Sequence, residues 1–400
     1  MHTRRKIAAP TLLITLMLVI SGNFPAYSAE TSGKNDTQRM EAMLAKSLLS
    51  INDNKLGDAL NEVDSLLKIN PNFKLAQLVR GDLLLARAQP LSDFGNMPGA
   101  PQAEIQDFSD EARVRLKRYQ NQPPTQAPKY IWQLDPSQRH AIVVDTSTST
   151  LYVYENVDGV ARYVTDFYVS IGKLGTKKIS EGDQKTPLGV YFVSANLPKR
   201  SLTDFYGSGA FPISYPNEWD RKQGRAGHGI WLHGTPSNTF SRPPKSSNGC
   251  VVLSNQDLDK LSKILQVGVT PVIITDQMDW GNEQDQAEHA NLMQAVEQWR
   301  KDWASKNTPA YLKHYARTFS GGGENLKTWS AHKKKVNAGK SWVKVNLSKL
   351  SVFAYPNQPD MAVVNFEQDY ASNNLSNRMK KRQYWMKFDN RWQIIYEGAV

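Results

Sequence analysis

The spacing of apolar residues changes along this 400-residue chain, and this change restricts the fold more than any single motif does. Residues 37–122 carry apolar side chains three or four positions apart, as amphipathic helices do. After Arg139 the apolar residues alternate with polar ones or form short β-branched and aromatic runs. A helical pattern returns at Glu283 and gives way to alternating strands near Trp342. The pattern predicts a multidomain α+β protein: a helical module, a mostly β domain and a C-terminal α+β domain.

The helical module is predicted from residues 37–122. Within it, helical patterns over Leu56–Ile69 and Leu75–Ala88 flank a break at Asn70-Pro71-Asn72, which resembles a tetratricopeptide-like hairpin. One such hairpin cannot bury its own apolar face. It is therefore expected either to dock a partner protein or a second copy of the chain, giving a homodimer, or to serve as a plain helical cap.

The first 28 residues have the three regions of a signal peptide. Basic Arg4-Arg5-Lys6 precedes the apolar run Thr11–Ile20, and Ala26-Tyr27-Ser28 offers a small-residue cleavage site. The apolar run is short for a bilayer, which takes about 20 residues to cross. Cleavage and export to the periplasm are therefore predicted, with a retained membrane anchor as the alternative.

The charge and cysteine content narrow the choice of partners. The formal net charge is +11, and much of the excess lies after residue 283. A basic surface suggests an anionic partner, and because the chain is predicted to be exported, nucleic acid is not expected. With one cysteine, the chain can form no internal disulfide and no cysteine-based metal site. No metal or other cofactor is expected.

That single cysteine, Cys250, follows Ser247-Asn248-Gly249 and lies downstream of His233. A thiol is a strong nucleophile only as the thiolate, and a nearby imidazole can take its proton. The apolar run before His233 predicts a buried strand that ends at Gly234, while Gly249 allows close backbone approach. The alternative is a buried core thiol, because free cysteine is among the most buried residue types. A lone thiol in an exported protein is liable to oxidation, which favours a catalytic role.

Two segments carry a family resemblance. His233-Gly234-Thr235, a proline-rich loop and Ser247-Asn248-Gly249-Cys250 form the first, and Gly182-Asp183-Gln184-Lys185-Thr186-Pro187-Leu188-Gly189-Val190-Tyr191 forms the second. Together they resemble the YkuD-like L,D-transpeptidase family, whose members act on peptidoglycan stem peptides. The resemblance implies a β-rich catalytic domain, here residues 138–276. It also implies peptidoglycan stem peptides as substrate and makes a wall-associated protein a candidate partner for the helical module.

The resemblance also implies roles for individual residues. Cys250 is the expected nucleophile and His233 the base, with the imidazole oriented by the Gly234 carbonyl. The amides of Gly249 and Cys250 are the expected oxyanion donors. Substrate contacts are expected from Ser247, Asn248, Arg225, Tyr215 and His228. His228 is also a rival base, but its odd offset from His233 places the two imidazoles on opposite faces of a strand. For Arg225, a local ion pair with Asp220 is the alternative.

Residues 283–400 combine helices with later alternating strands, a pattern that resembles the nuclear-transport-factor-two-like fold. Such a domain is appended to cell-shape L,D-carboxypeptidases. The catalytic segment departs from the usual transpeptidase pattern at Asn248 and Val252. The expected reaction is therefore L,D-transpeptidation through a Cys thioester, with water as acceptor (an L,D-carboxypeptidase or amidase that trims stem peptides for cell shape) as the alternative. A non-catalytic wall-binding scaffold is the alternative of another class.

Overall fold

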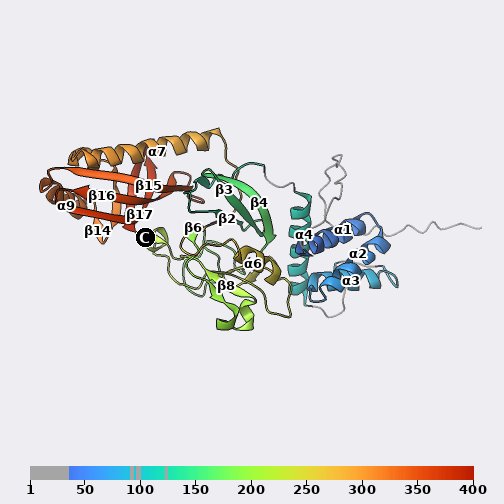
Figure 1. The fold of residues 1–400 in the computed structure, drawn as a ribbon. Helices are drawn as coiled ribbons and strands as arrows, with labels where there is room; N and C mark the ends of the chain where they lie inside the picture. The colour runs from blue at the N-terminus through green and yellow to red at the C-terminus, as the bar shows by residue number, and fades with distance from the viewer. Residues whose placement is uncertain (1–35, 91–93, 96–100, 122–124) are drawn as a thin grey trace, which may run out of the picture. The chain divides into compact units, whose positions relative to one another are not determined.

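The computed structural model describes residues 36–90, 94–95, 101–121 and 125–400, which fall into two compact units (Figure 1). One unit contains the chain up to residue 122 together with residues 235–244 and 254–257. The other contains residues 123–234, 245–253 and 258–400. The predicted signal peptide, residues 1–28, lies outside the described residues.

The first unit is a set of helices. They are α1 (Asp36–Asn52), α2 (Leu56–Ile69), α3 (Lys74–Leu85) and α4 (Gln102–Gln120). Their apolar stripes meet in one core that includes Leu44, Val63 and Phe73. Small residues allow close packing there, and the buried Ser47 hydroxyl donates to the Ala59 carbonyl across α1 and α2 (2.8 Å). The predicted helices are present, with α3 ending three residues earlier than expected.

The mostly β part of the second unit contains three sheets. One sheet has the strand order β4-β3-β2-β12-β6, a second has the order β11-β9-β8-β7, and β10 pairs with β5. The strands are β2 (His140–Asp145), β3 (Thr150–Val157), β4 (Val160–Tyr168), β5 (Ile171–Gly172), β6 (Gly189–Phe192), β7 (Leu197–Pro198), β8 (Gly209–Pro212), β9 (Trp231–His233), β10 (Lys245–Ser247), β11 (Val251–Val252) and β12 (Pro271–Thr275). Short helices connect them: η1 (Lys199–Ser201), η2 (Asp204–Tyr206), α5 (Glu218–Lys222) and α6 (Asn255–Ser262).

The C-terminal part combines helices with a long sheet of strand order β1-β15-β16-β17-β18-β13-β14. Its elements are β1 (Ile131–Gln133), α7 (Glu283–Ala304), α8 (Thr308–Leu312), β13 (Tyr315–Gly321), β14 (Glu324–Asn325), α9 (Leu326–Ala338), β15 (Val343–Ala354), β16 (Met361–Ser372), β17 (Leu375–Phe388) and β18 (Arg391–Ala399). Figure 1 shows α7 lying along the sheet that contains β15, β16 and β17. Because aromatic residues dominate cores, Trp299, Trp303, Trp342 and Trp385 are expected to be buried, and Trp299, Trp303 and Trp385 are buried in this core.

The sequence predicts a short helix over Ala310–Ala316 and a flexible break at Ser320-Gly321-Gly322-Gly323. The structure differs from these two expectations and from the expected burial of Trp342. The predicted helix over Ala310–Ala316 is replaced by α8 and the start of β13. Ser320 and Gly321 continue β13 instead of forming a flexible break, because Gly321 runs against β18: a Cβ at this position would lie 2.3 Å from the Glu397 carbonyl oxygen. Trp342, expected in the core, is 49% exposed.

The mostly β part and the C-terminal part share one core. Ile142 and Val144 of β2 face the core between the first two sheets. Ala141 and Val143, on the other face of β2, belong to a cluster that also contains residues of the C-terminal sheet. In that cluster Phe192 lies edge-on to Phe353, with ring centroids 6.1 Å apart. The fully apolar run of β2 is therefore explained by burial on both faces.

Helix α5 adds polar contacts between the same two parts. Glu218 accepts from Arg382 (3.1 Å) and from the Tyr384 hydroxyl (2.9 Å), and the ion pair is largely buried. Lys222 donates to the carbonyls of Thr318 and Ile395. These bonds attach α5 to β13, β17 and β18.

Candidate active site

Two adjacent parallel strands bring Cys250 and His233 to the same face of a sheet. Val251 of β11 is the register partner of Leu232 in β9, and Val252 is the partner of His233. Leu232 and Val251 point into the core. Because side chains alternate along a strand, His233 lies on the opposite face, and Cys250, which directly precedes β11, is expected on that face diagonal to His233. The strand register is therefore consistent with a thiol and an imidazole that act as a pair.

The His233 imidazole is held in one orientation. Its side chain is almost fully buried, and Nδ1 lies 2.7 Å from the Gly234 carbonyl oxygen. A carbonyl can only accept, so Nδ1 carries the proton and Nε2 is the unprotonated nitrogen. The Gly234 amide in turn donates to the Tyr206 carbonyl (3.1 Å). The Gly234 peptide is therefore fixed at both ends, and the tautomer suits Nε2 for accepting a proton.

Aromatic rings surround this imidazole. The Tyr206 ring lies edge-on at 5.1 Å and the Phe205 ring at 5.9 Å between centroids. Tyr206 also packs on Trp231 at 4.8 Å. Phe205 is 44% exposed, so an apolar surface borders the catalytic candidate. Nothing in the sequence pattern singled out Phe205 or Tyr206, because contacts between β9 and η2 are not local.

The Cys250 thiol is accessible. The residue is half-buried, and its Sγ donates to the Gly229 carbonyl at 3.3 Å. The partial exposure of Cys250 contradicts the alternative that it is a fully buried core thiol. A weak bond from a thiol to a carbonyl leaves the proton available for transfer to a base.

The turn that precedes Cys250 is closed by Ser247. The Ser247 hydroxyl accepts from the Gly249 amide (3.0 Å) and donates to the Cys250 carbonyl (2.6 Å). The Ser247 side chain is buried, and both of these hydrogen bonds join groups within the turn, so the hydroxyl stabilises the turn. The Gly249 amide, expected to be an oxyanion donor, is directed at Ser247 instead. A short Ser side chain two residues earlier takes this donor, and the oxyanion role of the Gly249 amide stays a prediction.

Gly249 is required by the backbone at this turn. Its φ is +120°, and a Cβ there would lie 2.7 Å from the Lys185 carbonyl oxygen. Thr186, which is fully buried, lies next to this contact: its hydroxyl donates to the Gly249 carbonyl (3.0 Å) and accepts from the Gly172 amide (2.9 Å). From the sequence, Thr186-Pro187 is expected only to form a turn that holds the sheet. The Thr186 hydroxyl also joins the turn before Cys250 to β5.

Asp183 orders the loop that leads to Thr186. Its carboxylate pairs with Lys178 (2.7 Å) and accepts from the amides of Ile179, Ser180 and Lys185. Partial burial alone would raise the pKa of Asp183, but these hydrogen bonds outweigh it and lower the pKa to about 2. The conspicuous Asp of the second motif is thus explained by loop structure.

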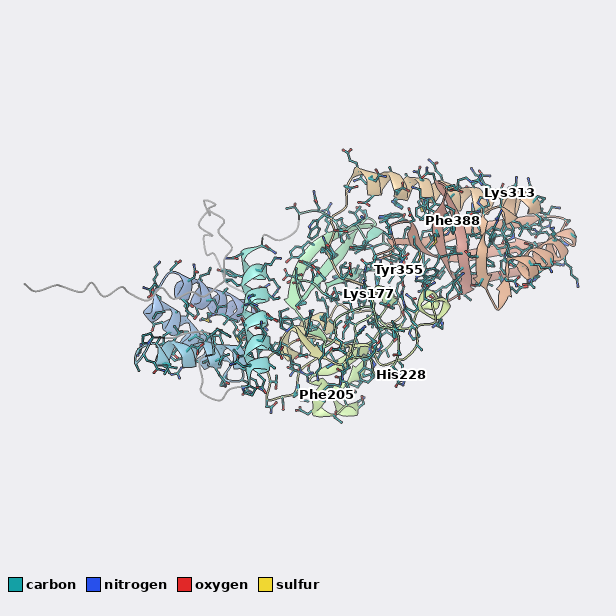
Figure 2. All side chains as sticks on the ribbon, turned by 180° about the vertical axis from the view of Figure 1, so that it is seen from behind. Lys177, Phe205, His228, Lys313, Tyr355 and Phe388 are labelled. Carbon is teal, nitrogen blue, oxygen red and sulfur yellow. The ribbon has the colours of Figure 1, made fainter. Side chains whose placement is uncertain are left out.

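The remaining predicted substrate contacts are distributed differently. Tyr215 is buried and donates to the Ala226 carbonyl (3.1 Å). Arg225 forms the local ion pair with buried Asp220 (3.0 Å). Asn248 is exposed, and His228 is 79% exposed with Nδ1 3.4 Å from Glu181. Figure 2 shows His228 and Phe205 on the surface of the yellow-green part of the chain.

The buried groups around Arg225 form a network. Asp220 accepts from the Asn217 amide and from the Tyr191 hydroxyl (both 3.1 Å). Burial raises the pKa of Asp220, although these bonds and Arg225 oppose the rise. Arg225 therefore has a structural partner that any substrate carboxylate would have to share.

Two further observations concern the described residues only. Among residues 36–90, 94–95, 101–121 and 125–400, His, Cys, Asp and Glu side chains form no cluster of three or more able to hold a metal ion. In the same part of the chain, no helix combines the length and apolar character needed to span a bilayer.

Comparison with known families identifies the class of protein that this fold and site define. Residues 139–274 match the L,D-transpeptidase catalytic domain of the YkuD family. Residues 291–398 match the Cds6 C-terminal NTF2-like domain. The chain therefore contains an L,D-transpeptidase-fold catalytic domain followed by an NTF2-like domain, which confirms the resemblance.

Two solved structures are similar to this chain over most of their own length. Bd1075 of Bdellovibrio bacteriovorus is 29% identical with a TM-score of 0.61, and the match covers 69% of this chain and 98% of that one. The helical cell shape determining protein Pgp2 of Campylobacter jejuni is 25% identical with a TM-score of 0.58, over 69% of this chain and 96% of that one. No curated protein sequence matches significantly.

Proposed function

We propose that this chain is a periplasmic peptidoglycan enzyme that cleaves stem tetrapeptides through a thioester on Cys250. One observation carries the proposal: the register of β9 and β11 brings together a partly exposed thiol and an imidazole whose Nδ1 faces the Gly234 carbonyl, so that Nε2 is the basic nitrogen. The YkuD-family match supports the substrate class.

The chemistry uses this pair twice. Nε2 of His233 takes the Cys250 proton, and the sulfur attacks the carbonyl between the L-centre of the third stem residue and the D-alanine that follows. The C–N bond breaks, and His233 returns the proton to the departing D-alanine amine. The acyl group remains on sulfur as a thioester. In the second half His233 deprotonates the acceptor, which attacks the thioester, and the thiol is restored.

The acceptor decides the class of reaction. We propose water, which makes the enzyme an L,D-carboxypeptidase that leaves a tripeptide. Support comes from the similarity to the helical cell shape determining protein Pgp2 of Campylobacter jejuni over 69% of this chain, and from the NTF2-like domain of this chain, which by resemblance is appended to cell-shape L,D-carboxypeptidases. An amine acceptor, giving L,D-transpeptidation, is the second candidate and is favoured by the family of the catalytic domain.

Incubation of the purified protein with disaccharide tetrapeptide, followed by mass spectrometry, tests both. Tripeptide and free D-alanine alone support hydrolysis, whereas cross-linked dimers support transfer. Cys250→Ala and His233→Ala should yield neither product, and His228→Ala should still form the thioester. If Cys250→Ala processes the tetrapeptide at the wild-type rate, the thioester mechanism is wrong. If the wild-type protein binds sacculi but makes no product, the scaffold alternative gains support.

A further inference from the structure

The loop between the two catalytic strands belongs to the helical unit. Thr235–Pro244 joins β9 to β10, yet it clusters with α1 to α4, whereas His233, Gly234 and residues 245–253 belong to the other unit. The loop therefore leaves the catalytic domain directly after the residue that orients the imidazole. This arrangement requires specific contacts to hold the loop among the helices.

Phe240 supplies the apolar part of these contacts. Its side chain is buried in the helical core, and its ring lies 4.6 Å from the Phe73 ring between centroids. Its amide is 3.4 Å from the Asn72 carbonyl oxygen, at the turn between α2 and α3. The proline turn of the predicted hairpin thus forms part of the socket that receives the loop.

Ser241 supplies the polar part. Its hydroxyl donates to Glu111 of α4 (2.8 Å). Glu111 is almost fully buried and is neutralised by the equally buried Arg115 (2.9 Å), whose guanidinium lies 5.0 Å from the centre of the Phe73 ring. A buried carboxylate is costly unless it is paired and hydrogen-bonded. This ion pair is therefore a fixed polar anchor for the Ser241 hydroxyl, next to the apolar contacts that hold Phe240.

Hydrogen bonds within the loop continue from the anchor toward the active site. The Thr235 hydroxyl donates to the Thr239 carbonyl (2.6 Å), and the Thr235 carbonyl accepts from the Asn255 side chain (2.8 Å). Thr235 is buried and follows Gly234 in the chain, and the Gly234 carbonyl holds Nδ1 of His233. Fixing Phe240 and Ser241 thus restrains the peptide that sets the imidazole orientation.

We propose that the helical module is a positioning element for catalysis, in which Phe240 and Ser241 anchor the loop and so hold the Gly234 carbonyl against His233. This inference rests on the proposed function of the Cys250–His233 pair. It assigns the module a role in the reaction itself, in addition to any partner it docks.

Phe240→Ala in the full-length mature protein tests the proposal. Because Cys250 is the only cysteine, iodoacetamide alkylation reports on this thiol alone. The variant should lower kcat for tripeptide release about 10- to 100-fold with little change in KM, since small misplacements of catalytic groups have effects of this size. The pH profile of alkylation should also shift relative to wild type. Phe240→Leu should restore most of the rate, and Ser241→Ala should give a smaller loss.

Leu60→Ala is the matched control, because Leu60 is buried in the same helical core but is not one of the residues, Asn72, Phe73 and Glu111, whose contacts with the loop are described above. It should lower the melting temperature of the module while leaving kcat and the alkylation profile as in wild type. Equal losses in Leu60→Ala and Phe240→Ala would overturn the proposal, as would a wild-type kcat and profile in Phe240→Ala. Alkylation needs no substrate, so this outcome is distinguishable from a wild-type protein that simply fails to process tetrapeptide.

Discussion

Replacing Thr186 by valine should loosen the turn that carries the nucleophile. Valine has nearly the shape of threonine, so the change leaves no void, but it removes the hydroxyl that joins Gly172 to Gly249. The Gly172 amide and the Gly249 carbonyl both lie in buried residues. Each buried group left without a partner costs about 1–3 kcal/mol. The two together should reduce stability by about 2–6 kcal/mol, concentrated at the β5–β10 edge.

The same substitution should affect the reaction, because Gly249 immediately precedes Cys250. A displaced turn should slow thioester formation about 10- to 100-fold. Thr186→Ser is the matched variant: it retains the hydroxyl and loses only a methyl group, at a cost of about 1 kcal/mol. Urea unfolding followed by fluorescence and thioester formation followed by intact-protein mass spectrometry measure the two effects. If Thr186→Val matches Thr186→Ser in both assays, the hydroxyl does not hold the turn and the reasoning fails.

Three further predictions follow from the site and its supports. Gly249→Ala should abolish thioester formation, because the Cβ of the new alanine would clash with the Lys185 carbonyl. Gly182→Ala, where φ is also positive but the space around the Cβ is open, should retain activity. Equal activities of the two variants in the tetrapeptide assay would contradict this prediction. Glu218→Ala should lower the free energy of unfolding, measured in urea, by about 3–5 kcal/mol, because the buried Arg382 loses its ion-pair partner. Asp110→Asn, which removes an exposed ion pair with Arg113, should change the free energy of unfolding little. Because the pKa of Asp183 is lowered, its ionised carboxylate contributes fully to stability above its ordinary pKa of about 4, and this contribution is lost as the pH falls toward about 2. Acid unfolding of Asp183→Asn should therefore lack the stability change that Asp183 causes in this pH range. An acid transition equal to that of the wild type would contradict this prediction.

Much of the fold follows from periodicity. The β2 run of four consecutive apolar residues predicts a buried strand, and the helical spacing predicts α1 to α4. What covers a buried strand is a long-range property: the contact of Phe192 with Phe353 joins residues far apart in sequence. The pairing of Ile131 in β1 with Phe353 in β15 also joins residues far apart in sequence, so the sequence does not predict it. Because β1 belongs to the C-terminal sheet, this sheet begins before the predicted boundary at residue 283.

The proposed catalytic pair can be identified from the sequence because its motif is local, whereas the contacts that support it cannot. Cys250 and His233 stand in short recognisable segments, and the Gly234 carbonyl follows from the same segment. Thr186 acts through a bond across 63 residues, and Ser247 competes for the Gly249 amide in a way that only the turn geometry reveals. Tyr215, an aromatic residue near a motif, is expected to contact substrate; the structure buries its side chain against the Ala226 carbonyl, which the local sequence does not reveal.

The core shared by the mostly β part and the C-terminal part has a practical consequence. A protein truncated after residue 282 would present Val143, Tyr154 and Val190 to water, because Phe353, Tyr355 and Tyr384 would be missing from their cluster. Figure 2 shows Tyr355 amid the side chains of this region. Such a fragment should aggregate on expression, so attempts to assign separate tasks to the two parts will need point substitutions on exposed surfaces instead of deletions.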